Sequence, residues 1–360
     1  MKLGLVGLPT SGKTTVFNLL TGADEATAAF ASGRTEAKIG MATVPDGRVD
    51  RLARLYQPRR TVRAQIECTD LPGLATGESR EGRNQFLSAV RNVDALVQVV
   101  RAFRNDAVPH VLESVDPGRD LELLHMELLL ADLAVVEKRI ERLRAGKKLS
   151  KENQVELSAL ERILPALEAE GRVAAVALSV EEQEQLRGFA FLTERPVLVV
   201  VNMDEEQFRS GRYPGEDKLQ AYAREHGMLV LPLCAQLELE ISRLAPDDRA
   251  LFLADLNAAQ SGIDRLAQAA YELLGLISFF TVGEDEVKAW TIEAGTNAKR
   301  AAGKIHSDIE RGFIRAEVVR YQDLDDLGSM AKVKEKGLFR LEGKEYVVQD
   351  GDIINFRFNI

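Results

Sequence analysis

The chain has 360 residues, of which 45% are hydrophobic and 29% charged, and its formal net charge is −9. This composition is typical of a globular protein with more than one domain, and the negative charge argues against wholesale coating by nucleic acid while leaving room for a local basic patch. Two cysteines, Cys68 and Cys234, exclude a disulfide framework, and no apolar run approaches the roughly 20 residues of a membrane span. We therefore expect a cytoplasmic protein with no membrane partner.

The first stretch with a chemical signature is Gly-x-x-x-x-Gly-Lys-Thr at residues 7–14, which follows a short apolar run and precedes the start of a helix. This strand–loop–helix pattern predicts a phosphate-binding P-loop rather than a chance glycine-rich turn. Lys13 would reach the β- and γ-phosphates, and the Thr14 hydroxyl would ligate Mg²⁺. The residues predicted to surround the phosphates are Thr10, Ser11, Gly12, Lys13, Thr14 and Thr15.

Residues 23–33 are small and polar and predict a mobile loop. In a P-loop switch protein, a threonine of this loop senses the γ-phosphate and completes the Mg²⁺ shell. Thr35 is the candidate, with Thr27 in the same loop, and an ordinary surface threonine is the alternative.

A second switch is predicted where the alternating residues 61–69 lead into Asp70-Leu71-Pro72-Gly73. Asp70 would hold Mg²⁺ through water, and the Gly73 N–H would contact the γ-phosphate. Lys13, Thr14, Asp70 and Gly73 are thus the predicted catalytic set. Leu74 stands where Ras-like enzymes carry the glutamine that orients the attacking water, so either another group orients it or turnover is slow.

Residues 94–100 predict a further buried strand, after which apolar residues recur at alternating steps of three and four in two runs, separated by Gly146 and Ser150. This pattern predicts an antiparallel helical hairpin. The runs are Met126, Leu129, Leu133, Val136, Ile140 and Leu143, then Leu157, Leu160, Leu164 and Leu167. Cations gather at the tip against one acid, Glu141: Lys138, Arg139, Arg142, Arg144, Lys147, Lys148 and Lys151. A solvated hairpin end and an arm that contacts RNA phosphates remain alternatives.

The strand predicted at residues 196–201 is followed by Asn202-Met203-Asp204-Glu205, where GTPases carry Asn-Lys-x-Asp to read guanine. Met203 replaces the lysine, and the longer Glu205 side chain replaces the aspartate, which weakens the case for GTP and leaves ATP open. The alternative is that Asn202 and Glu205 merely begin a helix. Cys234 and Ala235 end the next strand, where a Ser-Ala pair usually backs the base.

These motifs resemble those of the YchF or Obg-like ATPases, a branch of the translation-factor-related P-loop GTPases. The resemblance covers essentially the whole chain and is most specific in its C-terminal third. The segments that carry it are 7–9, 70–74, 84–87, 99–103 and 202–205, followed by 279–281, 286–292, 301–306, 312–317 and 346–352.

The resemblance implies an α/β fold in three parts. A P-loop GTPase-like domain would span 1–118 and 183–277, an inserted helical coiled-coil hairpin 119–182, and a TGS domain of ubiquitin-like β-grasp fold 278–360. It further implies hydrolysis of ATP in preference to GTP with Mg²⁺, an adenine covered by Met203, and binding to the ribosome (large subunit) or RNA through hairpin and TGS domain. A monomer is expected.

Three departures from the family pattern stand out. Thr10-Ser11 replaces Asn-Val in the P-loop, so a role of that asparagine in binding a monovalent cation does not carry over to Thr10. An ungapped alignment of the first switch puts Arg34 rather than Thr35 at the threonine position, and Cys234 replaces a serine. A GTP-specific GTPase and a nucleotide-dependent switch with negligible hydrolysis are the alternative functions.

Overall fold

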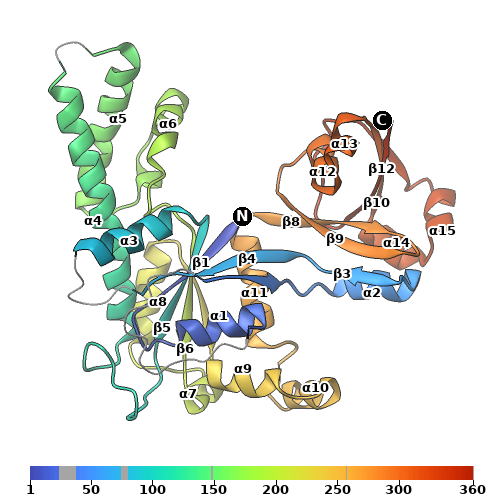
Figure 1. The fold of residues 1–360 in the computed structure, drawn as a ribbon, viewed down its shortest axis with the longest axis horizontal. Coiled ribbons are helices and arrows are strands. Elements are labelled where there is room, and N and C mark those ends of the chain that lie inside the picture. The colour runs from blue at the N-terminus through green and yellow to red at the C-terminus, as the bar shows by residue number, and fades with distance from the viewer. Residues whose placement is uncertain (24–37, 74–79, 147–148, 257, 360) are drawn as a thin grey trace. The chain divides into compact units, whose positions relative to one another are not determined.

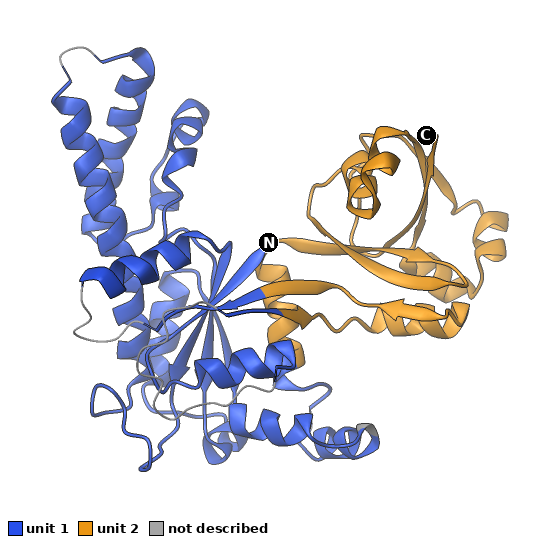
Figure 2. Cartoon of the chain, viewed as in Figure 1, with its two compact units in different colours: residues 1–40, 68–263 blue, residues 41–67, 264–360 orange. Residues whose placement is uncertain are grey.

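The computed structural model describes residues 1–23, 38–73, 80–146, 149–256 and 258–359, and the chain forms two compact units (Figures 1 and 2). Unit 1 consists of Met1–Gly40 and Cys68–Ile263, and unit 2 of Met41–Glu67 and Asp264–Ile360. Among the helices of these described residues, none has both the length and the apolar character needed to cross a membrane.

Unit 1 is built on a six-stranded sheet with the order β2-β4-β1-β5-β6-β7, in which β1, β5, β6 and β7 pair in parallel. Every residue of β5 and nearly every residue of β6 is buried, as expected for parallel strands covered on both faces. The strands are β1 Lys2–Val6, β2 Lys38–Thr43, β4 Gln65–Asp70, β5 Ala95–Arg101, β6 Val197–Asn202 and β7 Leu229–Leu233, with residues 41–43 of β2 and 65–67 of β4 counted in unit 2. Because β1, β5 and β6 run parallel, their carboxyl ends meet at one edge of the sheet.

Helices pack on both sides of this sheet (Figure 1). Phe86 and Val90 of α3 join Leu96 of β5 in one apolar cluster, while Leu219 and Ala223 of α8 belong to another. The helices outside the hairpin are α1 Lys13–Thr21, α3 Arg80–Arg91, α7 Glu205–Ser210, α8 Glu216–Glu225, α9 Ala235–Ser242, α10 Pro246–Asp255 and the start of α11 Gly262–Leu273.

The predicted helical hairpin is formed by α4 (Pro117–Arg144) and α5 (Lys151–Glu168), followed by a return through η1 (Val173–Ala175), α6 (Val180–Leu186) and η2 (Arg187–Phe189). Its seam contains the predicted leucines together with Ala159 and Ile163, which lie outside the predicted runs and are fully buried. The buried Asp132 accepts hydrogen bonds from the backbone amides of residues 192 and 193 and so fastens α4 to the return segment.

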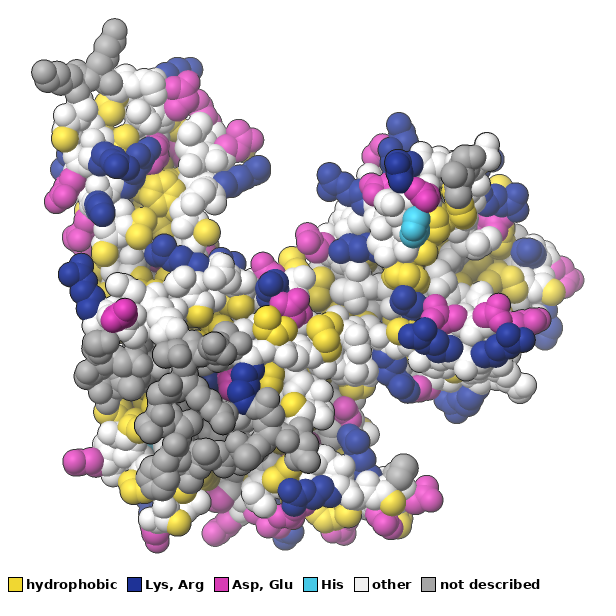
Figure 3. All heavy atoms as spheres, in the orientation of Figure 1, with side chains coloured by type: hydrophobic (Ala, Val, Ile, Leu, Met, Phe, Trp, Pro, Cys, Tyr) yellow, Lys and Arg dark blue, Asp and Glu magenta, His cyan; other side chains and the backbone are white. Residues whose placement is uncertain are grey.

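The tip of the hairpin is less basic than the sequence analysis expected. Arg139 forms a two-point ion pair with Glu156, at 2.6 and 2.7 Å, and Arg144 pairs with Glu161 at 2.6 Å. Both acids lie on α5 and so were missed by counting charges along the tip alone. Lys and Arg side chains accordingly alternate with Asp and Glu over the hairpin (Figure 3). Lys147 and Lys148 lie outside the described residues.

Unit 2 contains a second six-stranded sheet, with the order β11-β10-β12-β8-β9-β3. The strands are β3 Arg60–Val62, β8 Leu276–Val282, β9 Glu286–Glu293, β10 Phe313–Arg320, β11 Arg340–Glu342 and β12 Asp352–Phe358. β8 pairs with β9 and β10 with β12 in antiparallel fashion, whereas β12 and β8 are parallel. The helices are α2 Gly47–Tyr56, α12 Ala298–Ile305, α13 Ser307–Arg311, α14 Tyr321–Leu327 and α15 Met330–Glu335.

The compact units differ from the predicted division of the chain, because residues 41–67 and 264–277 belong with the C-terminal part. The three-residue strand β3 pairs in parallel with β9, and Arg48 of α2 bonds Asp350 at 2.7 Å. A pairing between strands more than 220 residues apart leaves no trace in local periodicity, which explains the difference. The small face of α12, formed by Ala298, Ala301 and Ala302, packs into the core of this unit.

Candidate functional site

The P-loop connects β1 to α1, and its backbone is fixed by Gly12 at the start of the helix. Gly12 has φ +92°, and a Cβ atom there would lie 2.2 Å from Nδ2 of Asn202, so only glycine fits. No side chain of the described residues caps α1 at this end. The first amides of the helix, together with its dipole, are thus available to an anion.

Three of the predicted catalytic side chains meet just beyond this loop. The Lys13 ammonium contacts Oδ1 of Asp70 and donates to the carbonyl of Leu71 at 2.5 Å, and Thr14 Oγ1 donates to Asp70 Oδ2 at 3.2 Å. Lys13 is 13% exposed and Asp70 9%. Residues 56 positions apart are thereby brought into one cluster at the end of β4 and the start of α1.

The oxygen atoms of this cluster fit Mg²⁺. Mg²⁺ is usually held by one or two protein oxygens, with water and phosphate oxygens supplying the rest of an octahedral shell. Thr14 and Asp70 present two such oxygens 3.2 Å apart. Among the described residues, no group of three or more His, Cys, Asp or Glu side chains is arranged to hold a metal ion, so such a cation would depend on phosphate oxygens.

The remaining switch residues are placed only in part. Gly73 lies against the P-loop, because a Cβ atom on it would come within 3.4 Å of the Gly7 carbonyl. Thr15 lies in the first turn of α1 and is half-buried. Thr27, Thr35, Arg34 and Leu74 lie outside the described residues.

Asn202 joins three segments at the end of β6. Its Nδ2 donates to the carbonyl of Ser11 at 3.0 Å, and its Oδ1 accepts from the amide of Ala235 at 3.1 Å. The side chain is 4% exposed. Asn202 therefore lies in a strand and clamps the P-loop to the start of α9. The interpretation that it merely begins a helix is wrong.

The other residues predicted to face the base are arranged differently. Met203 is 2% exposed and packs in the apolar cluster of α8, so it presents no surface to a base in this structure. Glu205 is the first residue of α7, and its exposed carboxylate pairs with Arg209 at 2.6 Å. The preceding residue, Asp204, forms a capping box with Gln207. Cys234 is buried next to Ala235, and burial raises the pKa of its thiol.

The sequence analysis missed Arg101, the last residue of β5. Its side chain is 1% exposed, and Nη1 donates to Oγ1 of the P-loop residue Thr10 at 3.3 Å. Burial lowers the pKa of Arg101. An arginine that directly follows the largely apolar, buried run of a parallel strand is the signal that could have indicated it, since such a residue lies at the same sheet edge as the P-loop.

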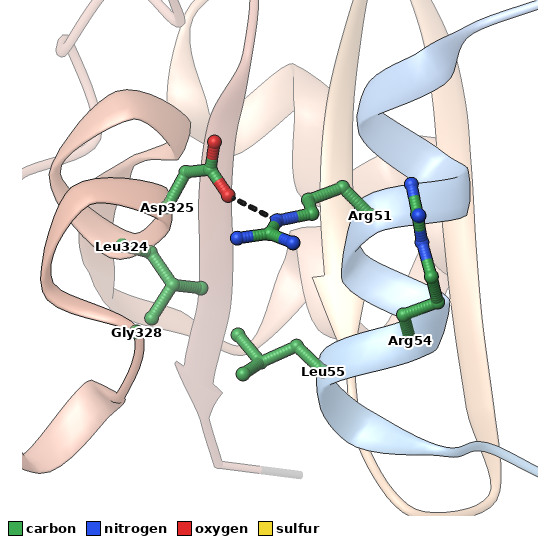
Figure 4. A pocket seen from close by; sticks show the side chains of 6 residues that line it. All are labelled: Arg51, Arg54, Leu55, Leu324, Asp325 and Gly328. Atoms are coloured by element: carbon green, nitrogen blue, oxygen red, sulfur yellow. Dashed lines mark hydrogen bonds and ion pairs between the residues drawn. The ribbon is translucent and has the colours of Figure 1, made fainter.

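A pocket of about 160 Å³ lies within unit 2, between α2 and α14 (Figure 4). Arg51 reaches across it to Asp325 at 2.6 Å, and Leu55 and Leu324 face each other below that pair. None of the predicted site residues lines this pocket, so it is separate from the P-loop cluster.

Two family models match the chain. The model YchF-GTPase_C, described as a protein of unknown function (DUF933), matches residues 276–359. The second model, described as a 50S ribosome-binding GTPase, matches residues 2–131. The two matches cover the strand-rich C-terminal part and the segment that carries the P-loop.

Relatives match over the full length of the chain. It is 44% identical to the Ribosome-binding ATPase YchF of Bacillus subtilis (strain 168), with 99% of both chains covered. It is 42% identical to the protein of the same name from Haemophilus ducreyi, over all of this chain and 99% of the relative. The solved structure of the Schizosaccharomyces pombe YchF GTPase superposes with a TM-score of 0.87 at 34% identity, over 99% of this chain and 97% of that one.

Proposed function

The chain belongs to the YchF family, and we propose that it is a Mg²⁺-dependent P-loop ATPase that associates with the ribosome. The observation that carries the proposal is the cluster of Lys13, Thr14 and Asp70 behind an uncapped helix start. Such an arrangement recognises a phosphate group, through the helix start and the lysine, together with a cation that prefers oxygen ligands.

The side chains divide the work on the phosphates. The amides that follow Gly12 would hold the phosphate oxygens, and Lys13 would turn from Asp70 to the β- and γ-phosphates, because their oxygens carry more negative charge than a single carboxylate. Thr14 and Asp70 would hold Mg²⁺, which would supply positive charge beside the γ-phosphate. Gly73 would contribute an N–H to the γ-phosphate, and because the Leu74 side chain has no hydrogen-bonding group, either another group orients the attacking water or turnover in the free protein is slow.

We infer ATP as the preferred substrate, with GTP as the second candidate. The guanine-reading aspartate is replaced by Glu205, whose carboxylate is 55% exposed and engaged with Arg209. A longer acid directed at Arg209 does not present the two acceptors that guanine requires at a fixed point. The bacterial relatives are named ATPases and the S. pombe protein a GTPase, so the base preference is the point on which the family names differ.

The ribosome is the proposed partner because the bacterial relatives are named ribosome-binding and the N-terminal model is described as 50S ribosome-binding. We propose that the large subunit or its RNA is contacted by the hairpin and by the C-terminal part, taken as a TGS domain of β-grasp fold. Lys138, Arg142 and Lys151 are exposed cations of the hairpin that suit phosphate contacts. A cytoplasmic monomer completes the proposal.

The test is ATP hydrolysis with and without purified 50S subunits. We expect slow turnover by the free wild-type protein, stimulation by 50S subunits, and loss of both in Lys13→Met. Lys218→Met is the matched control, because Lys218 is 61% exposed and pairs with Glu122 away from the P-loop. Equal turnover by Lys13→Met and the wild type would show that the P-loop does not carry the activity.

A further inference from the structure

Arg101 is held in place at the end of β5 by four hydrogen-bond acceptors and one aromatic ring. Its guanidinium donates to the carbonyls of Phe103 at 3.2 Å, Val108 at 2.9 Å and Asn105 at 3.4 Å. It also lies 4.4 Å from the centre of the Phe103 ring. A buried guanidinium stays charged, so its N–H groups need acceptors, and the chain at 103–108 provides three of them.

The remaining acceptor is Thr10, at 3.3 Å from Nη1. Thr10 is the P-loop residue with an unusual backbone, because its φ is +64°, a conformation that β-branched residues rarely adopt. Without a restraint, Thr10 would return to a negative φ, and this rotation would move the neighbouring backbone amides of the P-loop. The bond from Arg101 opposes that movement.

Arg101 and Asn202 act on consecutive residues of the loop. They are register partners on the adjacent strands β5 and β6, and Asn202 donates to the carbonyl of Ser11 at 3.0 Å. One strand end thus holds the side chain of Thr10 and the next strand end holds the backbone of Ser11. Two side chains at the ends of neighbouring strands of the sheet therefore hold the P-loop in place.

We propose that Arg101 is a positioning residue of the nucleotide site, which holds Thr10 and thereby keeps the P-loop in its phosphate-binding conformation before nucleotide arrives. The inference rests on the proposed function, since it concerns binding at the same P-loop. A loop that is already ordered does not lose conformational entropy on binding, so the bond contributes to affinity without touching the ligand. Its loss increases the rate at which nucleotide leaves, because the loop relaxes out of the bound conformation.

The test measures binding and release of fluorescent ADP and ATP analogues by purified full-length variants. Thr10→Val removes the hydroxyl at constant shape and is expected to weaken binding about tenfold through faster dissociation. Thr10→Ser keeps the hydroxyl and is expected to recover most of the affinity that Thr10→Val loses. Arg101→Lys keeps the charge without the fork of donors and is expected to lose a similar factor, with Arg104→Lys, at an exposed neighbour, as its control.

The double variant separates positioning from a general effect on folding. Combined with Arg101→Lys, Thr10→Val should cause no further loss, because the two changes remove one interaction. Losses that multiply to about a hundredfold would overturn the proposal. So would an Arg101→Lys protein that melts at a lower temperature but binds with wild-type affinity.

Two outcomes remain distinguishable from failure of the proposed function. If Arg101→Lys does not fold, the comparison of Thr10→Val with Thr10→Ser decides, and equal affinities of these two variants overturn the positioning role alone. If the wild-type protein binds neither ATP nor GTP, the proposed function fails and the positioning role fails with it.

Discussion

The ammonium group of Lys13 lies against the carboxylate of Asp70, within a cluster that also includes the hydroxyl of Thr14. The Asp70 carboxylate therefore pairs with Lys13 in this structure. It would be free to ligate a cation once Lys13 binds phosphate instead. Nucleotide and Mg²⁺ are expected to bind together. The phosphates attract the Lys13 ammonium away from Asp70, and Mg²⁺ replaces the ammonium as the positive charge beside the Asp70 carboxylate.

Asp70→Asn tests this exchange. The amide keeps the shape of the side chain but attracts a divalent cation far less, so the variant should bind ATP with little dependence on Mg²⁺. In the wild type we expect Mg²⁺ to tighten ATP binding about tenfold, and in the variant less than about twofold. The measurement is titration calorimetry with Mg²⁺ and with a chelator. An unchanged effect of Mg²⁺ in Asp70→Asn would contradict the assignment.

Gly12→Ala tests the packing of the P-loop on Asn202. The added methyl group would lie 2.2 Å from Nδ2 of Asn202 in a residue with φ +92°, and we expect a loss of about 2–4 kcal/mol in unfolding free energy together with loss of nucleotide binding. Gly211→Ala is the control, since Gly211 has φ +68° but open space around it, and should cost only about 1 kcal/mol. Urea denaturation of the nucleotide-free proteins compares the two. Equal losses would show that the contact with Asn202 is unimportant.

The pH dependence of stability should report on His125, which packs where α4 meets α8. Its Nδ1 lies 2.6 Å from the hydroxyl of Tyr222, and its ring is 4.5 Å from that of His226. Burial, the nearby His226 and Arg172 lower the pKa of His125 to about 4. Between the ordinary pKa of about 6.5 and this value, the unfolded chain binds a proton that the folded chain does not, so stability falls as pH falls through that window.

From pH 7 to pH 5, this one group should remove about 2 kcal/mol of unfolding free energy. His125→Asn should lose correspondingly less over the same interval, whereas His306→Asn, at a side chain that is 62% exposed, should behave like the wild type. Urea denaturation at the two pH values provides the comparison. Parallel losses in His125→Asn and the wild type would rule out His125 as the source.

Ribosome binding should depend on the exposed cations of the hairpin that the structure describes. Arg139 and Arg144 are engaged with acids of α5, so the exposed Lys138, Arg142 and Lys151 are the better positions for charge reversal. Glutamate at all three should weaken 50S binding and lower its logarithmic salt slope by about 0.7–0.9 per lost phosphate contact.

Reversal of Arg212, Arg224 and Arg243, which are also exposed but lie outside the hairpin, changes the net charge equally and should leave the slope unchanged. Sedimentation with 50S subunits at several salt concentrations measures both sets. Wild-type binding by the hairpin variant would show that this surface does not meet the ribosome.

Local sequence patterns predicted the P-loop and the hairpin, because each is encoded by residues that lie close together in the sequence. The spacing from Gly7 to Thr14 marks a strand, a loop and a helix, and steps of three and four mark the helical seam. The membership of β3 and α2 in unit 2 was not predictable in this way, because it depends on pairing with residues that follow more than 220 positions later.

The chemistry of the site was predictable only where a motif carries it. Lys13 and Asp70 were predicted from their motifs, whereas the clamp by Asn202 and the buried bond from Arg101 depend on strand order, which no single segment encodes. Met203 was predicted to cover a base but packs in the core, since an apolar residue after a strand satisfies either role.

The most direct test of the account is titration calorimetry of ATP, ADP, GTP and GDP against nucleotide-free protein in the presence of Mg²⁺. The account predicts binding at one site, with the adenine pair tighter than the guanine pair by tenfold or more, about 1.4 kcal/mol. Tighter binding of the guanine pair would show that Glu205 still reads guanine. Absence of binding by all four nucleotides would contradict the central claim that the Lys13, Thr14 and Asp70 cluster is a nucleotide site.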